Sequence, residues 1–131
     1  GAAKNHESVG VIVHPSQYEK VLADLRVNGF GLSVKMKNEL MVEAFRHTAA
    51  YDSFVSSYFA EKYGAEKFPR ELAIGLSKTA QLRYGENPHQ QAALYRRIIQ
   101  TSTLVDARQL NGKELSYNNY LDADAAIQIV R

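Results

Sequence analysis

The sequence predicts an α/β protein, and three observations support that class. Val9-Gly10-Val11-Ile12-Val13 is a β-branched run typical of a buried strand. A helix pattern with start and stop signals follows it directly, and strand-then-helix is the repeating piece of an open α/β sheet. Near residues 65–70 the composition changes from helix-rich to strand-like sequence. With 131 residues, the chain has room for one ordinary domain or parts of two.

The first helix is expected to begin shortly after the predicted strand. His14-Pro15 ends the strand, because the residue before a proline is pushed toward extended geometry. Ser16 is the expected N-cap, with Glu19 completing a capping box. Gly29 is the expected C-terminal stop. The apolar face of this helix is predicted to consist of Val21, Leu22 and Leu25.

A second, longer helix is expected to be capped by Ser33 and to reach about Tyr63, where Gly64 ends it. Apolar residues recur at roughly helical spacing along this segment. A helix of this length is unusual in a globular domain, so the sequence leaves open a kink or break near Ala49-Ala50.

The second half of the chain is expected to contain short strands and one more helix. Leu72 to Ser77 alternates apolar and small residues with the period of a half-buried strand. Asn111-Gly112 is a strong turn signal, and the last helix is expected to open at Asn118 or Asn119. Three further strand or strand-loop pieces are expected at Ala92–Tyr95, Leu104-Val105 and Arg108–Leu110.

Composition excludes several classes of protein. The net charge is +2 and charges of both signs are interspersed, which argues against a nucleic-acid-binding stripe. The absence of cysteine excludes a disulfide framework and thiol catalysis. No long apolar run or signal-peptide pattern is visible, and the four histidines lack metal-ligand spacing. We therefore expect a cytoplasmic protein that binds no nucleic acid, membrane or metal.

The segment with the most chemistry is Leu82-Arg83-Tyr84-Gly85-Glu86-Asn87-Pro88-His89-Gln90. Arg83 offers a planar fork of donors that suits phosphate, and Tyr84 offers a flat ring with a polar tip. Gly85 permits unusual backbone conformations, and Asn87-Pro88 favours a turn. Two interpretations follow: a rigid loop that holds an anionic, ring-containing ligand, or a well-made turn with an exposed arginine.

The same segment, Leu82 to Gln90, resembles a characteristic stretch of a bifunctional purine-biosynthesis family. That family joins a phosphoribosyl-aminoimidazole-carboxamide (AICAR) formyltransferase to an IMP cyclohydrolase. Ala2–His6 is similar to a motif late in the cyclohydrolase domain, and Gln109–Asn119 resembles a stretch early in the transferase domain. His47–Asp52 fits between them. The segments keep the family's order, and the resemblance runs over essentially the whole chain.

The resemblance implies a boundary between two domains near residue 70. Residues 1–70 would form the C-terminal part of a layered, Rossmann-like cyclohydrolase domain similar to methylglyoxal synthase. Residues 71–131 would form the N-terminal part of a formyltransferase domain with a cytidine-deaminase-like architecture. The family protein is several times longer and forms homodimers, so we expect this chain to be an internal fragment of a dimeric parent.

The resemblance also assigns roles to four residues. Lys4 would serve the cyclohydrolase site by stabilising negative charge or transferring a proton, although a surface lysine is the alternative. Arg83 would anchor the 5′-phosphate of the ribotide, and Tyr84 would help to place the nucleotide. Asn119 is either a helix N-cap or a ribotide contact, and both roles can coexist because helix N-termini favour anions.

The implied activity belongs to the parent protein. It would transfer a formyl group from 10-formyltetrahydrofolate to AICAR and then cyclise formyl-AICAR to IMP, without a metal. The family's formyl-transfer Lys-His pair lies in a later segment that this chain lacks, so the chain alone is expected to be inactive. For His89, hydrogen bonding within the loop is favoured over general-base catalysis. The alternatives to the enzyme are a non-catalytic association module and a module that binds a ribotide or RNA.

Overall fold

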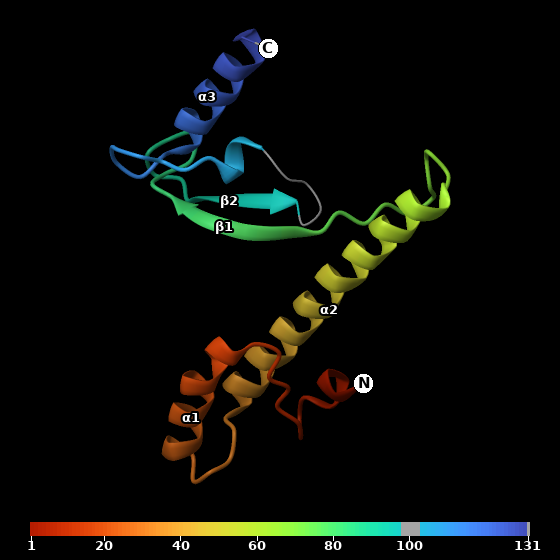
Figure 1. Ribbon diagram of the computed structural model, residues 1–131. Coiled ribbons are helices and arrows are strands. Elements are labelled where there is room, and N and C mark those ends of the chain that lie inside the picture. Colours follow the sequence, from red (N-terminus) through yellow and green to blue (C-terminus); the bar gives the residue numbers. More distant parts are fainter. Residues whose placement is uncertain (98–102, 131) are drawn as a thin grey trace. The chain divides into compact units, whose positions relative to one another are not determined.

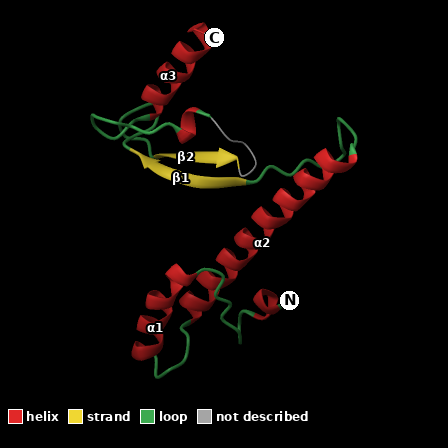
Figure 2. Cartoon of the chain, viewed as in Figure 1, coloured by secondary structure: helices red, strands yellow, loops and turns green. Residues whose placement is uncertain are grey.

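The computed structural model describes residues 1–97 and 103–130, which form two compact units, Gly1–Pro69 and Arg70–Arg131 (Figure 1). The described part of the first unit is helical, whereas the second combines a two-stranded sheet with helical segments (Figure 2). The described residues contain both helices and a small sheet, which agrees with the predicted α/β class. No helix within these ranges has an apolar stretch long enough to cross a bilayer.

The first unit is built around a small apolar core between two helices. Its elements are the 3-10 turns η1 (Ala2–Asn5) and η2 (Pro15–Gln17) and the helices α1 (Tyr18–Val27) and α2 (Val34–Tyr63). Val21 of α1 is buried against Met36 and Leu40 of α2, and the partly buried Leu25 and Leu32 pack on them. This core explains why α1 lies beside the N-terminal part of α2 (Figure 1).

Asp24 joins the end of α1 to the start of α2. Its two carboxylate oxygens accept hydrogen bonds from the Ser33 backbone N–H at 2.8 Å and from the Ser33 hydroxyl at 2.7 Å. Ser33 Oγ accepts in turn from Met36 N at 3.1 Å, which makes Ser33 the N-cap that the sequence predicts. The carboxylate also lies at the positive end of the α2 dipole, where a negative charge is stabilising.

Helix α2 is a single helix of 30 residues that ends where the sequence predicts. It runs without interruption through Ala49-Ala50, so the break that the sequence leaves open there does not occur. Gly64 ends the helix in the left-handed region, with φ 65° and ψ 48°, and its N–H donates to Ala60 O.

The helix predicted after Pro15 begins differently from the prediction. His14, rather than Ser16, is the cap, because His14 Nδ1 accepts from Ser16 N at 3.2 Å. Gln17, rather than Glu19, closes the capping box, with its Oε1 accepting from His14 N at 2.9 Å. Pro15 then starts η2, which leads into α1. Ser16 was expected as the cap because N-caps usually carry a hydroxyl or a short polar side chain. Here an imidazole nitrogen accepts the capping hydrogen bond instead.

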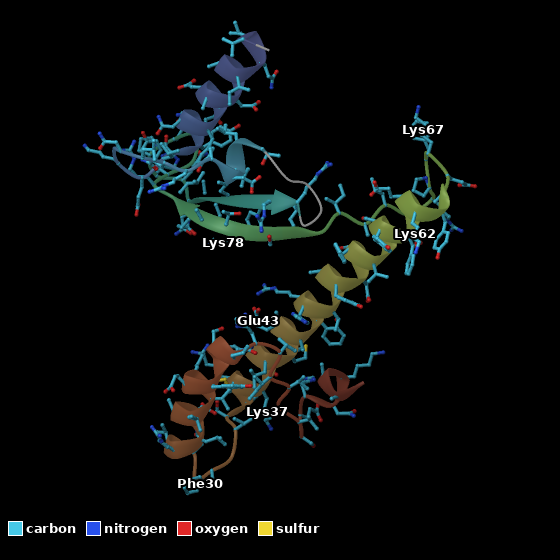
Figure 3. All side chains as sticks on the ribbon, in the orientation of Figure 1. Phe30, Lys37, Glu43, Lys62, Lys67 and Lys78 are labelled. Atoms are coloured by element: carbon cyan, nitrogen blue, oxygen red, sulfur yellow. The ribbon has the colours of Figure 1, made fainter. Side chains whose placement is uncertain are left out.

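The turn after α1 confirms the predicted stop. Gly29 follows the helix with φ 61°, and Phe30 is also left-handed with φ 63°. Phe30 N donates to Leu25 O at 2.8 Å, the bond that closes a Schellman motif. The Phe30 side chain projects from this turn and is 86% exposed (Figure 3). It therefore adds little to the core beside it.

The predicted strand Val9–Val13 is wrong for the described structure, in which this run has no regular secondary structure. Gly10 packs so closely on the core that a Cβ added there would lie 2.3 Å from Leu32 Cδ1. Val9 and Ile12 nevertheless remain 37% and 40% exposed. A strand needs a neighbour to complete its ladder of hydrogen bonds, and the described residues of this unit offer none.

The second unit contains an antiparallel hairpin. Strand β1 (Leu76–Leu82) pairs with β2 (Ala92–Arg97), with Leu76 opposite Arg97 and Leu82 opposite Ala92. The register is irregular between Lys78 and Ala80. The strand predicted at Ala92–Tyr95 is thus confirmed. The unit also holds the 3-10 turn η3 (Leu104–Asp106) and the helix α3 (Tyr117–Val130).

Two strand predictions in this unit need correction. The alternating run from Leu72 becomes a strand only at Leu76, which pairs with Arg97 of β2. Leu104-Val105 forms part of η3, and Arg108–Leu110 has no regular structure. Apolar pattern alone cannot supply the pairing partner that a strand requires.

A local hydrogen-bond network explains η3. The carboxylate of Asp106 accepts from Thr103 N at 3.1 Å and from the Thr103 hydroxyl at 3.0 Å. Arg96 Nη1 of β2 also lies 3.3 Å from this carboxylate. The backbone hydrogen bond from Thr103, followed by that of its hydroxyl, holds the pKa of Asp106 below its ordinary value. These bonds close a tight turn and thereby prevent an extended strand.

We expect Leu40→Ala to lower the free energy of unfolding of the first unit by about 2–3 kcal/mol, because it leaves a cavity in a small core. Leu40 is only 3% exposed. Urea unfolding of the 131-residue chain, followed by helical circular dichroism, measures the change. Leu22→Ala is the matched control, because Leu22 of α1 is 44% exposed. Equal losses in both variants would contradict the assigned core.

Candidate functional site

The chemistry-rich segment that begins at Arg83 is the connection between β1 and β2 (Figure 1). Its own hydrogen bonds close it: Gly85 N donates to Gln90 O at 2.9 Å, and Gln90 N donates to Asn87 O at 3.0 Å. The Gln90 side chain adds a third bond, because its Oε1 accepts from Asn87 N at 2.8 Å. The loop is therefore internally braced, as the sequence predicts.

Gly85 is required by this internal closure. The residue is buried, and a Cβ added to it would lie 2.9 Å from Gln90 Cβ and 3.1 Å from Gln90 Oε1. The sequence suggests that this glycine frees the backbone for an unusual conformation. The structure shows a different reason for glycine here, since the space that a side chain would need is filled by the other end of the same loop.

Arg83 and Tyr84 form a cation–π pair at the start of the loop. The guanidinium carbon lies 4.8 Å from the centroid of the Tyr84 ring, and Arg83 Nη2 donates to the Tyr84 hydroxyl at 3.2 Å. Arg83 is exposed, and its guanidinium makes no ion pair within residues 1–97 and 103–130. One edge of the fork is thus positioned by the phenol, and its other donors can bind an oxyanion.

Helix α3 begins earlier than predicted, and its cap is Ser116. Ser116 O accepts from Tyr120 N at 3.3 Å, and Ser116 is 1% exposed. Asn119 lies inside the first turn rather than at the cap, and its Oδ1 accepts from both Ser116 N and Ser116 Oγ at 3.0 Å. Asn119 is therefore not the N-cap, as one interpretation of the sequence had it, but the third residue of the helix. Its amide instead reaches back to the cap, as the third helical residue does in a capping box.

Three hydrogen bonds join the loop to the start of α3. Arg83 N donates to Leu115 O, and Tyr117 N donates to Tyr84 O, both at 3.1 Å. Asn118 Nδ2 donates to Glu86 O at 3.1 Å. The structure thus brings the backbones of Arg83 and Tyr84 to the same loop–helix junction as Asn119. Neither the cap role of Ser116 nor the contact from Asn118 to the loop was predicted from the sequence, although the spacing of Ser116 and Asn119 is that of a capping box.

The other candidate residues lie apart from this junction or lack the expected contacts. Lys4 belongs to the first unit, where it is exposed on η1. Its side chain makes no hydrogen bond to any residue in the described ranges. His89 is exposed in the loop, and the side-chain hydrogen bond favoured for it from the sequence is absent from the described part of the chain.

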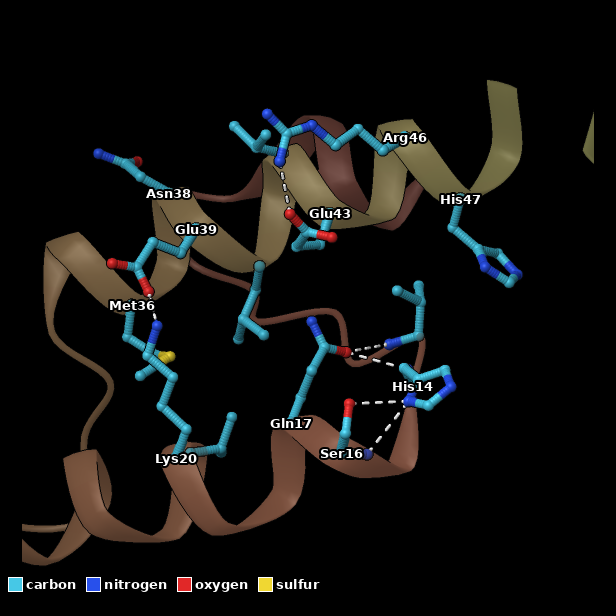
Figure 4. Close-up of a pocket in the computed structure, with 14 residues that line it drawn as sticks. His14, Ser16, Gln17, Lys20, Met36, Asn38, Glu39, Glu43, Arg46 and His47 are labelled. Carbon is cyan, nitrogen blue, oxygen red and sulfur yellow. Dashed lines mark hydrogen bonds and ion pairs between the residues drawn. The ribbon is translucent and has the colours of Figure 1, made fainter. Parts of the chain in front are cut away.

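A groove of about 860 Å³ lies in the first unit between the η2–α1 segment and α2 (Figure 4). Its charged side chains compensate one another, since Lys20 pairs with Glu39, and Arg46 lies 2.7 Å from Glu43. The hydrogen bond from Lys20 holds the pKa of Glu39 below its ordinary value. None of the four predicted site residues lines this groove. Paired charges make it a poor anion site compared with the loop that carries Arg83.

The junction offers two hydrogen-bond donors, a guanidinium and a phenol, beside the positive end of the α3 dipole. The N–H groups of Tyr117 and Asn119 are already bound to Tyr84 O and Ser116 Oγ. The guanidinium and the phenol suit a phosphate or another oxyanion. A ring attached to that anion could lie beside the aromatic side chain. Within the described residues, no three histidine or acidic side chains come together in a way that could hold a metal ion.

Comparison with known proteins identifies the class. A family model described as the AICARFT/IMPCHase bienzyme matches residues 2–131. The chain belongs to this family, as its sequence resemblance predicts. The bifunctional purine biosynthesis protein PurH of a Bacillus cereus strain is 51% identical over 131 residues, covering 99% of this chain and 25% of that protein. PurH of Bacillus anthracis is 50% identical over 131 residues, which again cover 99% of this chain and 25% of that protein. The chain thus spans about a quarter of the length of the relatives that it matches.

We expect Gly85→Ala to open the loop, because the added methyl group would overlap Gln90. Overpacking of this kind costs about 1–3 kcal/mol, so the amides of residues 85 and 90 should exchange with solvent about tenfold faster or more. Hydrogen exchange followed by NMR measures both. Gly31→Ala is the control, because its nearest atom is Asn28 O at 3.5 Å. Unchanged exchange at residue 90 would contradict the closure.

Proposed function

We propose that this chain spans the boundary between the two domains of a bifunctional enzyme. That enzyme formylates AICAR and cyclises the product, formyl-AICAR, to IMP. Residues 1–70 belong to the cyclohydrolase domain, with its methylglyoxal-synthase-like layered fold. Residues 71–131 belong to the formyltransferase domain, with its cytidine-deaminase-like fold. Family membership supports the activity, and the division of the compact units after Pro69 supports the boundary.

The observation that carries the transferase assignment is the Arg83–Tyr84 pair on an internally braced loop beside the N-terminus of α3. Arg83 binds the 5′-phosphate of AICAR through its free donors, and Tyr84 places the nucleotide. The aromatic amine of AICAR is a weak nucleophile, so holding it against the formyl donor lowers the entropic part of the barrier. The donor is 10-formyltetrahydrofolate, and the formyl group passes from the folate nitrogen to this amine.

Asn119 contributes through its position in the first turn of α3. Its Oδ1 is engaged by Ser116, whereas its Nδ2 makes no hydrogen bond to a described residue and remains a donor for the ribotide. The amide can therefore support the helix terminus and contact the ligand at once. The first N–H groups of α3 add a favourable field for an anion at the same place.

Lys4 acts in the second reaction. Ring closure joins the carboxamide nitrogen to the formyl carbon, and water leaves after proton transfer to the oxygen. Negative charge develops on the former formyl oxygen, and an ammonium beside it stabilises that charge and can donate the proton. The exposure of Lys4 on η1 supports access to a ligand.

The proposal extends to the whole protein. It is cytoplasmic and works as a homodimer, and its ligands are AICAR, formyl-AICAR and IMP rather than nucleic acid or membrane. No metal takes part in either reaction. The 131-residue chain alone catalyses neither reaction, because it carries only part of each site.

Arg83→Ala in the full-length protein should raise the KM for AICAR about 10- to 100-fold, since hydrogen bonds to a charged group contribute about 1.5–3 kcal/mol. Formyl transfer at varied AICAR concentration measures the change. Arg108→Ala is the matched control, because Arg108 is exposed and outside the loop. A KM that stays equal to that of the control would contradict the phosphate-binding role.

Lys4→Met should slow the cyclisation of formyl-AICAR about 100-fold or more while leaving formyl transfer unchanged, because one general acid or charge stabiliser is removed from one site only. Assays of the two half-reactions, each started with its own substrate, separate these effects. Lys35→Met is the control at another exposed lysine of the first unit. Normal cyclisation in Lys4→Met would exclude Lys4 from the chemistry.

A further inference from the structure

We propose that Asn118 is a positioning residue that sets the orientation of the Arg83–Tyr84 pair toward the ribotide. This inference rests on the proposed function of that pair. The observation behind it is the hydrogen bond from Asn118 Nδ2 to Glu86 O at 3.1 Å, which joins residues 32 positions apart. Asn118 itself need not touch the ligand.

Asn118 supplies the side-chain link among the three hydrogen bonds that join the loop to the start of α3. The other two run between backbone groups, from Arg83 N to Leu115 O and from Tyr117 N to Tyr84 O. Almost any side chain at those positions would leave the two backbone bonds in place. The amide of Asn118 is therefore the part of this junction that depends on residue identity.

The bond acts on a loop that is already closed. Glu86 lies between Gly85 and Asn87, and both of these residues donate their backbone N–H to Gln90. A restraint on Glu86 O therefore restrains the closed part of the loop as one body. Two anchors, one at the Tyr84 carbonyl and one at the Glu86 carbonyl, fix the direction in which the phenol and the adjoining guanidinium point.

The location of Asn118 in the first turn of α3 explains why this bond matters for an anion site. The same turn forms the positive end of the α3 dipole and carries Asn119. By joining Glu86 to this turn, the amide keeps Arg83 and the helix terminus in register with each other. Loss of the bond should leave the loop and α3 folded but misaligned with each other. Binding of the ribotide should then weaken, whereas the rate of the bound complex should change less.

Two substitutions of Asn118 remove the donor in different ways. Asn118→Asp keeps the shape, and a carboxylate in the first turn is favourable for the helix dipole, so α3 should not be destabilised. It also adds a negative charge that could repel a phosphate. Asn118→Leu is close in size and neutral, so an effect shared by both variants comes from the lost hydrogen bond. Asn111→Asp is the matched control, because Asn111 uses its Oδ1 to accept from Gly112 N and aspartate keeps that acceptor.

The test is steady-state formyl transfer by the full-length protein carrying each substitution. We expect Asn118→Asp and Asn118→Leu to raise the KM for AICAR about tenfold, with kcat changed less than about twofold, as loss of one positioning hydrogen bond predicts. Amide exchange should become faster at residues 83 and 117, the donors of the neighbouring bonds, and stay slow at residues 85 and 90. Asn111→Asp should match the unmodified protein in all these measurements.

The outcomes separate this inference from the proposed function. If Arg83→Ala raises KM but both Asn118 variants do not, the positioning role is overturned and the function stands. If only Asn118→Asp raises KM, charge repulsion is the cause and the positioning role is again overturned. If Arg83→Ala leaves KM unchanged, the proposed function fails, and the role of Asn118 falls with it.

Discussion

The candidate site depends on the hydrogen bonds that join the β1–β2 loop to the residues around Ser116. Helix α3 has no fully buried residue, so apolar packing among the described residues contributes little to holding it in place. Its beginning is instead held by backbone bonds from Arg83 and to Tyr84, with the nearly inaccessible Ser116 between them. Buried backbone groups must find partners, and here each segment supplies the partners of the other. The same bonds that anchor the helix therefore also shape the loop that carries the arginine.

Charge pairing distinguishes this junction from the groove in the first unit. In the groove, Lys20 and Arg46 already have carboxylate partners, so little positive charge remains for an anionic ligand. At the junction, Arg83 is oriented by a neutral phenol and keeps its charge for an external partner. An aromatic ring can orient a guanidinium without neutralising it, which is the useful property of a cation–π pair at a binding site. The groove is thus a less suitable site for a ribotide than the junction that carries Arg83.

Local signals predicted both ends of α2 well, and non-local structure poorly. Ser33 and Gly64 bound α2 as expected, because a cap hydroxyl and a left-handed glycine act within a few residues of chain. The run Val9–Val13 has the composition of a strand, yet a strand exists only when another segment pairs with it. Two caps were assigned to the wrong residue. The cap expected at Ser16 is His14, and the cap expected at Asn119 is Ser116.

The family, the α/β class, the main helices and the residues that offer donors to a ligand could all be predicted from the amino-acid sequence. These follow from residue types and from spacings within short stretches of chain. Two contacts became visible in the folded chain alone: Gln90 fills the space that a side chain at position 85 would need, and Asn118 reaches the carbonyl of Glu86. Neither contact could be read from spacing, because each depends on where a loop closes or where two distant segments meet. The geometry of hydrogen bonds between such segments is set by the folded backbone and not by the residues' separation along the chain.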